Sequence, residues 1–414
     1  MKKDNKKKNN KTGRVIKHLK SDRRILIKSL LWAIALFLVS YFLHNLPWSW
    51  GGPNVGQRIE QIRQIARGES IPSDLFLINV AYDRALVDVN DEFGLSKGNI
   101  DITDRKKLSE LLRQLKNSDY KYIILDVILT DEYHTNEDST LFGLISSMDN
   151  IVIAKSETTR LADDRLDGKA RYSDYSTNIL ESDFVKYEFI RNGEPTLPYQ
   201  VYLDLNGDRI TNWCGLYFFK GRLANKSVIL RYPVRLWNTL NIDNDAEDHA
   251  QVQYYNLGSD LLDIGTDIPS KAKDKIVVIG DFSENDMHDT YLGKIAGPVI
   301  NLNAYYALVN DNLTMPYGEI VFIILLYTLI WYLIFKRKSV ISAVPYFRKK
   351  HSDLFNLIIS FVSVGVLLMA ISGLMYIIFG LDMRIFIASV VFAAYDNWLK
   401  YKEQKSEKQK TKVI

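Results

Sequence analysis

One apolar segment near the start of the chain constrains its fold more than any other feature. Residues 29–43 contain no charged side chain, and the apolar segment reaches 25–46 when the polar residues near its ends lie at the interfaces. About 20 such residues are enough for a helix to cross a bilayer. Trp48 and Trp50 follow, as is typical of a membrane boundary. No small-residue cleavage pattern follows, so we expect a retained transmembrane helix over 25–46 and not a signal peptide.

Three further apolar segments near the C-terminus predict more membrane helices: Ile320–Phe335, Leu354–Leu381 and Ile385–Leu399. The last is the weakest, because Arg384 and Asp396 leave only a short uncharged stretch between them. It spans only if Arg384 reaches the headgroups and Asp396 lies at the far interface or faces another helix.

Charge divides the chain into basic ends and an acidic middle. Residues 1–46 hold 12 Lys and Arg against two acids, 318–414 hold 13 against six, and 47–317 hold 28 against 41. Lys and Arg are retained on the cytoplasmic side, so four spans place both termini inside and the acidic middle outside. Three spans would place the Lys-rich tail outside. The basic ends are expected to contact anionic lipids, and the uneven charge argues against a nucleic-acid binder.

We therefore expect five regions in an inner membrane protein. They are a basic cytoplasmic arm (1–24), a first transmembrane helix (25–46), an extracytoplasmic domain (47–317), three transmembrane helices (318–399) and a basic cytoplasmic tail (400–414). Cys214 is the only cysteine, so no intramolecular disulfide can form, and we expect this thiol to fill the core.

Short apolar runs alternate with helical patterns through the acidic middle. Strands are predicted at 75–80, 122–125 and 151–154, with a helix capped by Thr103 between the first two and a helix over 141–148 between the last two. This order predicts an α/β fold with a doubly wound, mainly parallel sheet.

The second half of the domain carries weaker signals and one clear one. The polar region 156–183 predicts a surface excursion, and further strands are expected at 185–190, 227–234 and 252–256, with a turn at Asn192-Gly193 and a helix over 198–205. The run 275–280 is the clearest late strand, and Pro298 predicts the first turn of a helix reaching Val309.

The order of these segments, between one anchor and a group of membrane helices, resembles the type-two CHASE domain, an extracytoplasmic sensory domain associated with bacterial cyclases and histidine kinases. The similarity covers most of 70–315. It is carried by these pieces: Ile78-Asn79-Val80-Ala81-Tyr82-Asp83, Ile123-Ile124-Leu125-Asp126, Asp138, Asn150-Ile151-Val152-Ile153-Ala154, Asn192-Gly193, Leu197-Pro198-Tyr199, Lys275-Ile276-Val277-Val278-Ile279-Gly280-Asp281, Asp289-Thr290, Gly297 and Asn303-Ala304.

The resemblance implies a sensory function. The family usually has a Trp-Pro-x-x-Arg segment after the first strand, whereas Asp101-Ile102-Thr103-Asp104-Arg105 occupies the comparable place here. The family also usually continues into a cytoplasmic kinase, cyclase or phosphatase, but 15 residues follow Leu399 here. We therefore expect no catalytic output in the chain and a signalling partner elsewhere.

Acidic residues end the predicted strands. The carboxyl ends of parallel strands meet at one edge, so Asp83, Asp126 and Asp281 are expected to converge on one crevice, and the following loop adds Asp289. A cation, or a cationic or hydroxylated small molecule, would suit such a site. The simpler alternative is that each Asp caps a turn or helix. Asp286 and His288 extend the cluster, with His288 only a weak candidate metal ligand.

These observations predict a membrane sensor that binds an unknown small-molecule or envelope ligand and passes its state to a separate protein. Two alternatives stay open: a membrane-anchored, metal-dependent enzyme using the Asp cluster, and an envelope assembly subunit. No nucleophile elbow, phosphate-binding glycine loop or zinc spacing is present, so no cofactor is predicted.

Overall fold

The computed structural model divides the chain into two compact units. An outer unit contains the described residues between 72 and 314, and a helical unit contains those of 1–46 and 315–411. The structure describes residues 2–46, 72–90, 96–177, 184–234, 236, 254–336, 362, 365–371, 373–374 and 385–411.

The outer unit is organised around a six-stranded sheet in which every neighbouring pair is parallel. Its strand order is β15-β1-β16-β4-β5-β6. The central strand β16 joins its neighbours in register, so that Asn79, Gly280 and Asp126 lie side by side at the carboxyl edge. The strands are β1 (Leu75–Asn79), β4 (Tyr122–Asp126), β5 (Ile151–Lys155), β6 (Ala170–Tyr172), β15 (Tyr255–Asn256) and β16 (Ile276–Gly280).

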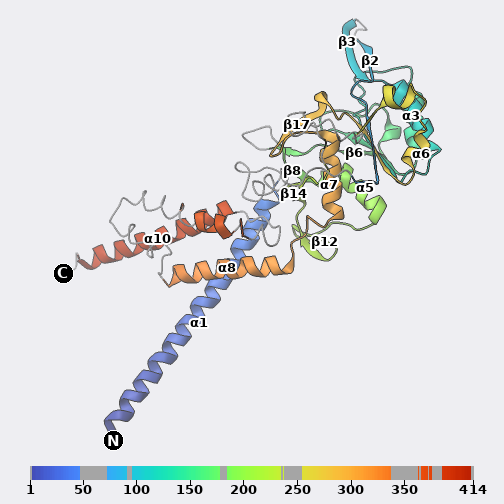
Figure 1. Ribbon diagram of the computed structural model, residues 1–414. Coiled ribbons are helices and arrows are strands. Elements are labelled where there is room, and N and C mark those ends of the chain that lie inside the picture. The colour runs from blue at the N-terminus through green and yellow to red at the C-terminus, as the bar shows by residue number, and fades with distance from the viewer. Residues whose placement is uncertain are drawn as a thin grey trace, which may run out of the picture. The chain divides into compact units, whose positions relative to one another are not determined.

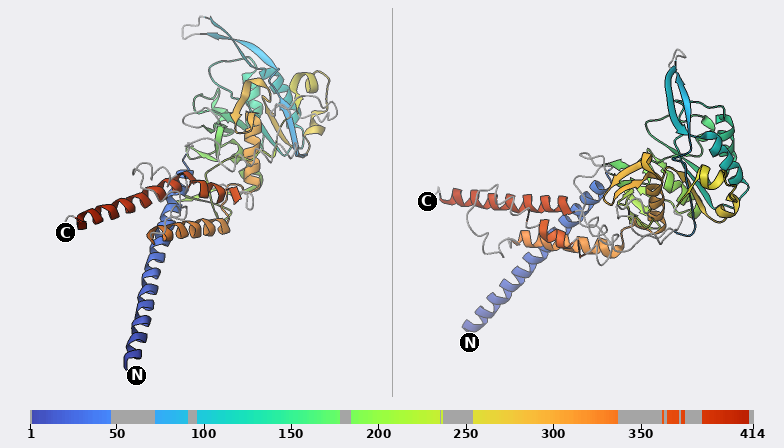
Figure 2. Two further views of the ribbon diagram at one scale, coloured as in Figure 1. Left: turned by 60° about the vertical axis from the view of Figure 1, so that its left-hand side comes forward. Right: turned by 45° about the horizontal axis from the view of Figure 1, so that its top comes forward.

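Both faces of this sheet are covered by helices, as Figures 1 and 2 show. Successive side chains of a strand point to opposite faces, and in β16 Val277 and Ile279 pack on one side while Ile276 and Val278 pack on the other. One face packs against α3 (Arg105–Lys116), α4 (Asp138–Ser147) and α6 (Ile268–Ala272), and the other against α5 (Leu197–Asn206) and α7 (Gly297–Val309). The predicted doubly wound α/β fold is confirmed for this unit.

Short antiparallel elements decorate the sheet. The hairpin of β2 (Arg84–Asn90) and β3 (Ser96–Thr103) projects from the unit in Figure 1. A π-helical turn, Leu257–Leu262, follows β15. The other short strands are β7 (Ser176–Thr177), β8 (Phe184–Glu188), β9 (Ile190–Arg191), β10 (Glu194–Pro195), β11 (Thr211–Trp213), β12 (Leu216–Phe219), β13 (Arg222–Ala224), β14 (Ser227–Val228), β17 (Met287–Thr290) and β18 (Gly293–Ala296).

Several local predictions need correction. The N-cap of α3 is Asp104, not Thr103, because the Asp104 carboxylate accepts hydrogen bonds from the backbone N–H groups of Lys106 and Lys107. The surface excursion 156–183 contains the edge strand β6, and the strand expected at 227–234 is limited to its first two residues. The turn at Asn192-Gly193 is confirmed, and it joins β9 to β10.

Cys214 is exposed, so the expectation that it fills the core is wrong. It forms the tight turn between β11 and β12 together with Gly215, with φ values of 51° and 83°. A two-residue hairpin with both φ values positive matches the twist of the flanking strands, which explains the position of the turn.

The helical unit contains α1 (Lys2–His44), α8 (Tyr317–Phe335) and α10 (Ile385–Thr411). Two of its segments are long and apolar enough to cross a membrane, Asp22–His44 and Tyr317–Phe335. The predicted four-helix membrane region is therefore not confirmed. Most of the expected span 354–381 lies outside the described residues. In α10 the apolar stretch of 385–399 continues as one helix into the Lys-rich sequence and ends at Thr411.

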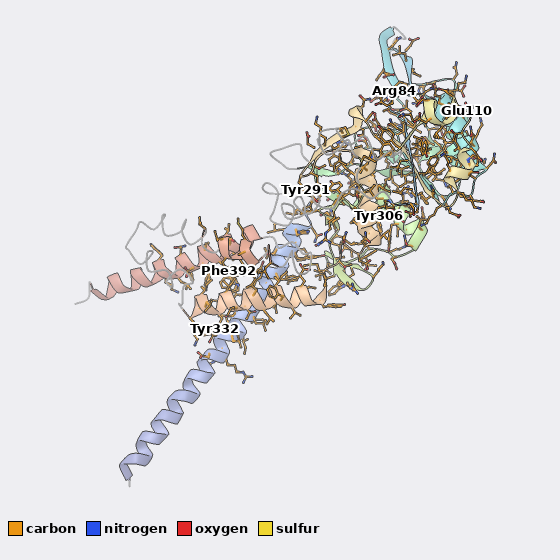
Figure 3. All side chains as sticks on the ribbon, in the orientation of Figure 1. Arg84, Glu110, Tyr291, Tyr306, Tyr332 and Phe392 are labelled. Atoms are coloured by element: carbon orange, nitrogen blue, oxygen red, sulfur yellow. The ribbon has the colours of Figure 1, made fainter. Side chains whose placement is uncertain are left out.

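The helices α1 and α8 pack against each other in opposite directions. Asp22 pairs with Lys336 at 2.6 Å, and further along α1 the rings of Trp32 and Trp331 lie 5.4 Å apart. The Tyr395 ring of α10 lies 5.0 Å from Trp331. Figure 3 labels two aromatic side chains of the helical unit, Tyr332 of α8 and Phe392 of α10. Aromatic contacts therefore join α1, α8 and the apolar half of α10.

Candidate functional site

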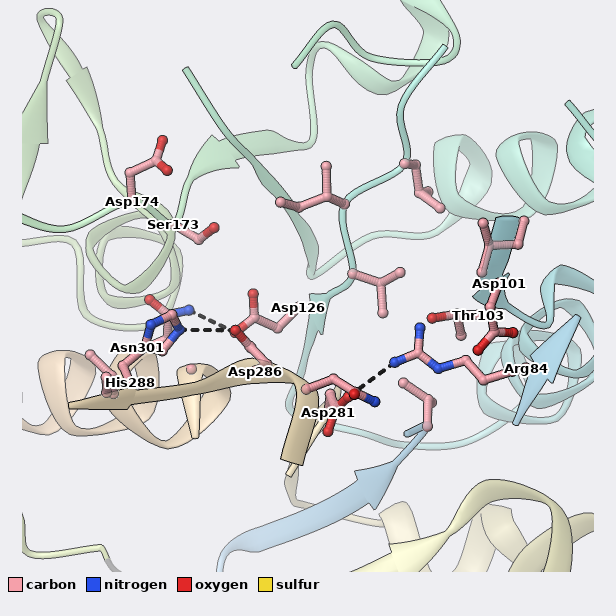
Figure 4. A pocket seen from close by; sticks show the side chains of 18 of the residues that line it. Arg84, Asp101, Thr103, Asp126, Ser173, Asp174, Asp281, Asp286, His288 and Asn301 are labelled. Atoms are coloured by element: carbon pink, nitrogen blue, oxygen red, sulfur yellow. Dashed lines mark hydrogen bonds and ion pairs between the residues drawn. The ribbon is translucent and has the colours of Figure 1, made fainter. Parts of the chain in front are cut away.

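A cavity of about 430 Å³ opens at the carboxyl edge of the sheet. Residues after β1, β4 and β16 form its floor, and the start of α7 and the segment after β6 complete its walls (Figure 4). Its polar lining consists of Arg84, Asp101, Thr103, Arg105, Asp126, Tyr133, Ser173, Asp174, Tyr175, Asp281, Asn285, Asp286, His288 and Asn301. This is the edge where ligands bind in parallel α/β sheets.

Gly280 brings α7 close to the end of the sheet. A Cβ atom at this position would lie 2.5 Å from the ring of Pro298 and 3.2 Å from the Cβ of Asp126. Only glycine permits this approach, because real Cβ atoms do not come so near to other carbon atoms. The first turn of α7 therefore lies directly beside Asp126.

Asp126 is held from α7 by a buried amide. The Asn301 Nδ2 donates to Asp126 Oδ2 at 2.7 Å, and the Tyr187 hydroxyl donates to Asn301 Oδ1 at 2.6 Å. Asn301 is 4% exposed and Tyr187 is fully buried. These two hydrogen bonds orient Asp126 Oδ2. The other carboxylate oxygen, Oδ1, has no hydrogen bond in the described part of the structure.

A second set of hydrogen bonds holds Asp286, beside Asp126. His288 Nε2 lies 2.9 Å from Asp286 Oδ1, and His288 Nδ1 contacts the Tyr175 hydroxyl. Both imidazole nitrogens are therefore used. Figure 4 shows the Asp126 and Asp286 carboxylates next to each other in the cavity.

The environment of Asp126 disfavours its charged form. Burial, and then repulsion from Asp286, raise the pKa of Asp126 from 3.8 to about 7, against the opposing effects of the Asn301 hydrogen bond and His288. Desolvation and a like charge both favour a neutral carboxyl group. Asp126 therefore exchanges a proton near neutral pH.

The two arginines of the cavity already have acidic partners. Arg84 pairs with Asp281 at 3.0 Å. Arg105, whose side chain is 3% exposed, forms an ion pair with Asp138 outside the lining and lies over the rings of Tyr133 and Phe142. Neither guanidinium therefore neutralises Asp126 or Asp286.

Only two of the four acids predicted to bind a ligand line the cavity. Asp126 and Asp281 line the cavity, whereas Asp83 and Asp289 do not. Asp83 is 5% exposed and accepts hydrogen bonds from Lys107 Nζ at 2.6 Å and from the Gly258 N–H at 3.0 Å. Asp289 is exposed on β17 opposite Lys294. The Asp83 carboxylate thus fastens α3 and the π-helical turn to β1.

Asp281 partly fits the simpler alternative, in which each Asp caps a turn or helix. Its Oδ1 accepts hydrogen bonds from the backbone N–H and the hydroxyl of Ser283, while Oδ2 holds Arg84. Asp281 therefore both shapes the loop after β16 and orients a side chain of the cavity.

Nothing in the described residues forms a metal centre, because no three His, Cys, Asp or Glu side chains converge to hold an ion. His288, the weak candidate, is committed to Asp286 and Tyr175. No observation therefore favours the metal-dependent enzyme.

Comparison with known protein families identifies the family of this chain. The CHASE2 domain profile matches residues 48–335. The chain belongs to the CHASE2 domain family. CHASE2 is an extracellular sensory domain, which confirms the resemblance seen in the sequence. No curated protein and no solved structure matches the chain significantly.

Two candidate spans flank the CHASE2 domain, in agreement with a membrane protein whose sensory domain lies outside the cytoplasm. The segment Asp101–Arg105 runs along the cavity wall through Asp101, Thr103 and Arg105.

Proposed function

We propose that this protein is a multi-pass membrane sensor whose cavity binds a small extracytoplasmic ligand and whose membrane helices pass the bound state to a separate protein. The observation that carries the proposal is the position of α7. Its first residues, Gly297, Ile300 and Asn301, line the cavity, and its last residue, Val309, is followed after seven residues by the membrane helix α8. One helix thus links the cavity to the start of a span.

The connection between α7 and α8 is fastened to the outer unit. Asp311 accepts a hydrogen bond from Lys220 Nζ at 2.8 Å, and the Asn225 N–H donates to the carbonyl of Leu313 at 2.9 Å. An isolated bridge pairs Ala224 with Thr314. A fixed connection can carry a displacement, provided that the ligand favours one arrangement by differential binding.

The antiparallel packing of α1 and α8 supports the proposed topology. The Asp22–Lys336 pair supports a topology in which the start of the first span and the end of the second lie on the same side of the membrane. Both ends continue into basic sequence, which favours the cytoplasmic side. In this proposal the basic ends and α10 are available to a cytoplasmic or membrane partner, and the chain itself catalyses no reaction.

Topology reporters fused after residue 45, within 338–350 and at the C-terminus should read outside, inside and inside. The expected result follows from the basic loops and from the shared side of Asp22 and Lys336. At each site, alkaline phosphatase, which is active outside the cytoplasm, and a fluorescent protein that is fluorescent inside it are fused in turn, and both signals are measured. An outside reading at the C-terminus would remove the membrane helix proposed within 385–399.

Filling the cavity should abolish ligand binding without unfolding the protein. Ser173 is a small residue of the lining, so Ser173→Trp should occupy much of the space that a ligand needs. The test is thermal stabilisation of the full chain in lipid nanodiscs, screened with organic amines, carboxylates, sugars and nucleotides. A ligand at 100 times its Kd stabilises by about 2.7 kcal/mol, which is easily measured as a higher melting temperature.

The matched control is Ser147→Trp, an identical change at an exposed position at the end of α4. The control should respond to the same compound as the natural chain, and Ser173→Trp should not. Stabilisation that survives in Ser173→Trp would place the ligand elsewhere and refute the cavity as the sensory site.

A further inference from the structure

The charges around the cavity define the class of molecule that it accepts. Five carboxylates line it, from Asp101, Asp126, Asp174, Asp281 and Asp286. Asp281 is paired with Arg84 and lies 8% exposed. The Asp174 carboxylate accepts hydrogen bonds from the Ser156 hydroxyl and the Glu157 N–H, which tie it to the neighbouring loop.

Asp126 and Asp286 form the part of the lining that lacks a balancing cation. Within the described ranges, no Lys or Arg pairs with either carboxylate, and of these two carboxylates His288 contacts that of Asp286. Two carboxylates side by side repel each other, and a partly buried site makes this repulsion stronger than in water. A positive group placed between them would remove it.

The remaining groups around this pair indicate an organic cation and not a metal ion. The groups that interact with Asp126 are Asp286 and His288, Asn301 from α7 and Tyr187 from β8. Asp174 and Tyr175, from the segment after β6, line the same cavity. No three metal-binding side chains converge among the described residues. An ammonium group carries three donors, which suits the free Asp126 Oδ1 and the Asp286 carboxylate.

We infer that the cavity binds a small organic amine, with its ammonium group held between Asp126 and Asp286. This inference rests on the proposed function and names the ligand class of the same site. A volume of about 430 Å³ accommodates a metabolite-sized molecule, and the remaining polar groups, Thr103, Ser173 and Asn285 among them, can hydrogen-bond its other end. Charge-assisted hydrogen bonds to two carboxylates supply the selectivity.

Isothermal titration calorimetry of the full chain in nanodiscs tests the inference by measuring the affinity for each probe. The probes are ethanolamine, putrescine, agmatine and glycinamide, each compared with a neutral counterpart such as ethylene glycol or 1,4-butanediol, and with Ca²⁺ and Mg²⁺. At least one amine should bind at pH 8, and its neutral counterpart should bind at least tenfold more weakly. Asp126→Asn and Asp286→Asn should each weaken amine binding by about 10- to 100-fold, whereas Asp289→Asn, an identical change at an exposed site of β17, should leave it unchanged.

The pH dependence provides an independent readout. Because ammonium and proton compete for Asp126, affinity should be constant between about pH 7 and the pKa of the amine, and should fall up to tenfold for each pH unit below pH 7. Asp126→Asn should lose this dependence. A structural role of Asp126 alone would not produce it.

The possible results separate this inference from the proposed function. A sugar, carboxylate or nucleotide that stabilises the natural chain, but not Ser173→Trp, would overturn the amine inference and leave the sensor proposal intact. Binding of Ca²⁺ or Mg²⁺ that Asp126→Asn abolishes would overturn it in favour of a metal site. Amine binding that is equal in the natural chain and in Asp126→Asn would also refute it.

Discussion

Replacing Asp138 by asparagine should lower the free energy of unfolding of the outer unit by about 3–5 kcal/mol, because it leaves the buried Arg105 guanidinium without its counter-ion. Arg105 is 3% exposed, and the Asp138 side chain is 12% exposed. The Thr135 hydroxyl donates to Asp138 at 2.5 Å, so the carboxylate also fixes the loop before α4. The measurement is the melting temperature of the full chain in nanodiscs, which should fall by about 10 °C.

The double variant Arg105→Met/Asp138→Leu should recover most of this loss, because replacing both members of a buried ion pair with apolar side chains removes the unpaired charge. Asp131→Asn is the matched control. Its partner Arg160 is 81% exposed and the two groups lie 3.7 Å apart, so the change should cost less than about 1 kcal/mol. Equal losses in Asp138→Asn and Asp131→Asn would refute the importance of the buried pair.

Asp126→Asn should have the opposite effect and stabilise the ligand-free protein at pH 8 by about 2–4 kcal/mol, at the expense of ligand binding. The pKa of Asp126 is raised from 3.8 to about 7 in the folded protein by burial and by Asp286. Between these values the folded protein keeps a proton that the unfolded chain has released. The contribution of Asp126 to stability is therefore largest in acid and declines as the pH rises from about 4 to 7.

Urea unfolding at pH 5, 6, 7 and 8 measures this effect as the difference between the natural chain and Asp126→Asn. The difference should grow with pH and level off above pH 7. Asp289→Asn, which changes an exposed carboxylate, should stay within about 0.5 kcal/mol of the natural chain throughout. If Asp126→Asn destabilised the protein equally at all four pH values, Asp126 would be a structural acid that is ionised throughout.

The central strands could be predicted from the sequence because nearly all of their residues are buried. The runs 75–78, 122–125, 151–154 and 276–280 are short, continuously apolar and bounded by turns, a pattern typical of parallel strands covered on both faces. The hairpin of β2 and β3 has no such signal. Its strands carry Arg84, Asp88 and Asp101, and backbone hydrogen bonds rather than a buried face hold them together.

The site could be predicted only in part. Asp126 and Asp281 follow strands that end at the same edge, so topology alone places them at the cavity. Asp83 ends a strand in the same way, but Lys107 and Gly258 occupy its carboxylate, and neither neighbour is visible from local sequence. The roles of Asn301 and Ser173 likewise depend on tertiary packing. An asparagine within an apolar helix, as at 301 and 303, was the available signal for a buried polar contact.

The short connection between α7 and α8 has a consequence for how signalling can evolve in this chain. An α-helix advances 1.5 Å and turns 100° with each residue. Because the segment after Val309 is fastened at Asp311 and Leu313, a single insertion before Tyr317 would change the rotational phase of α8 without altering the cavity. The length of this connection therefore determines the rotational phase at which α8 begins after α7.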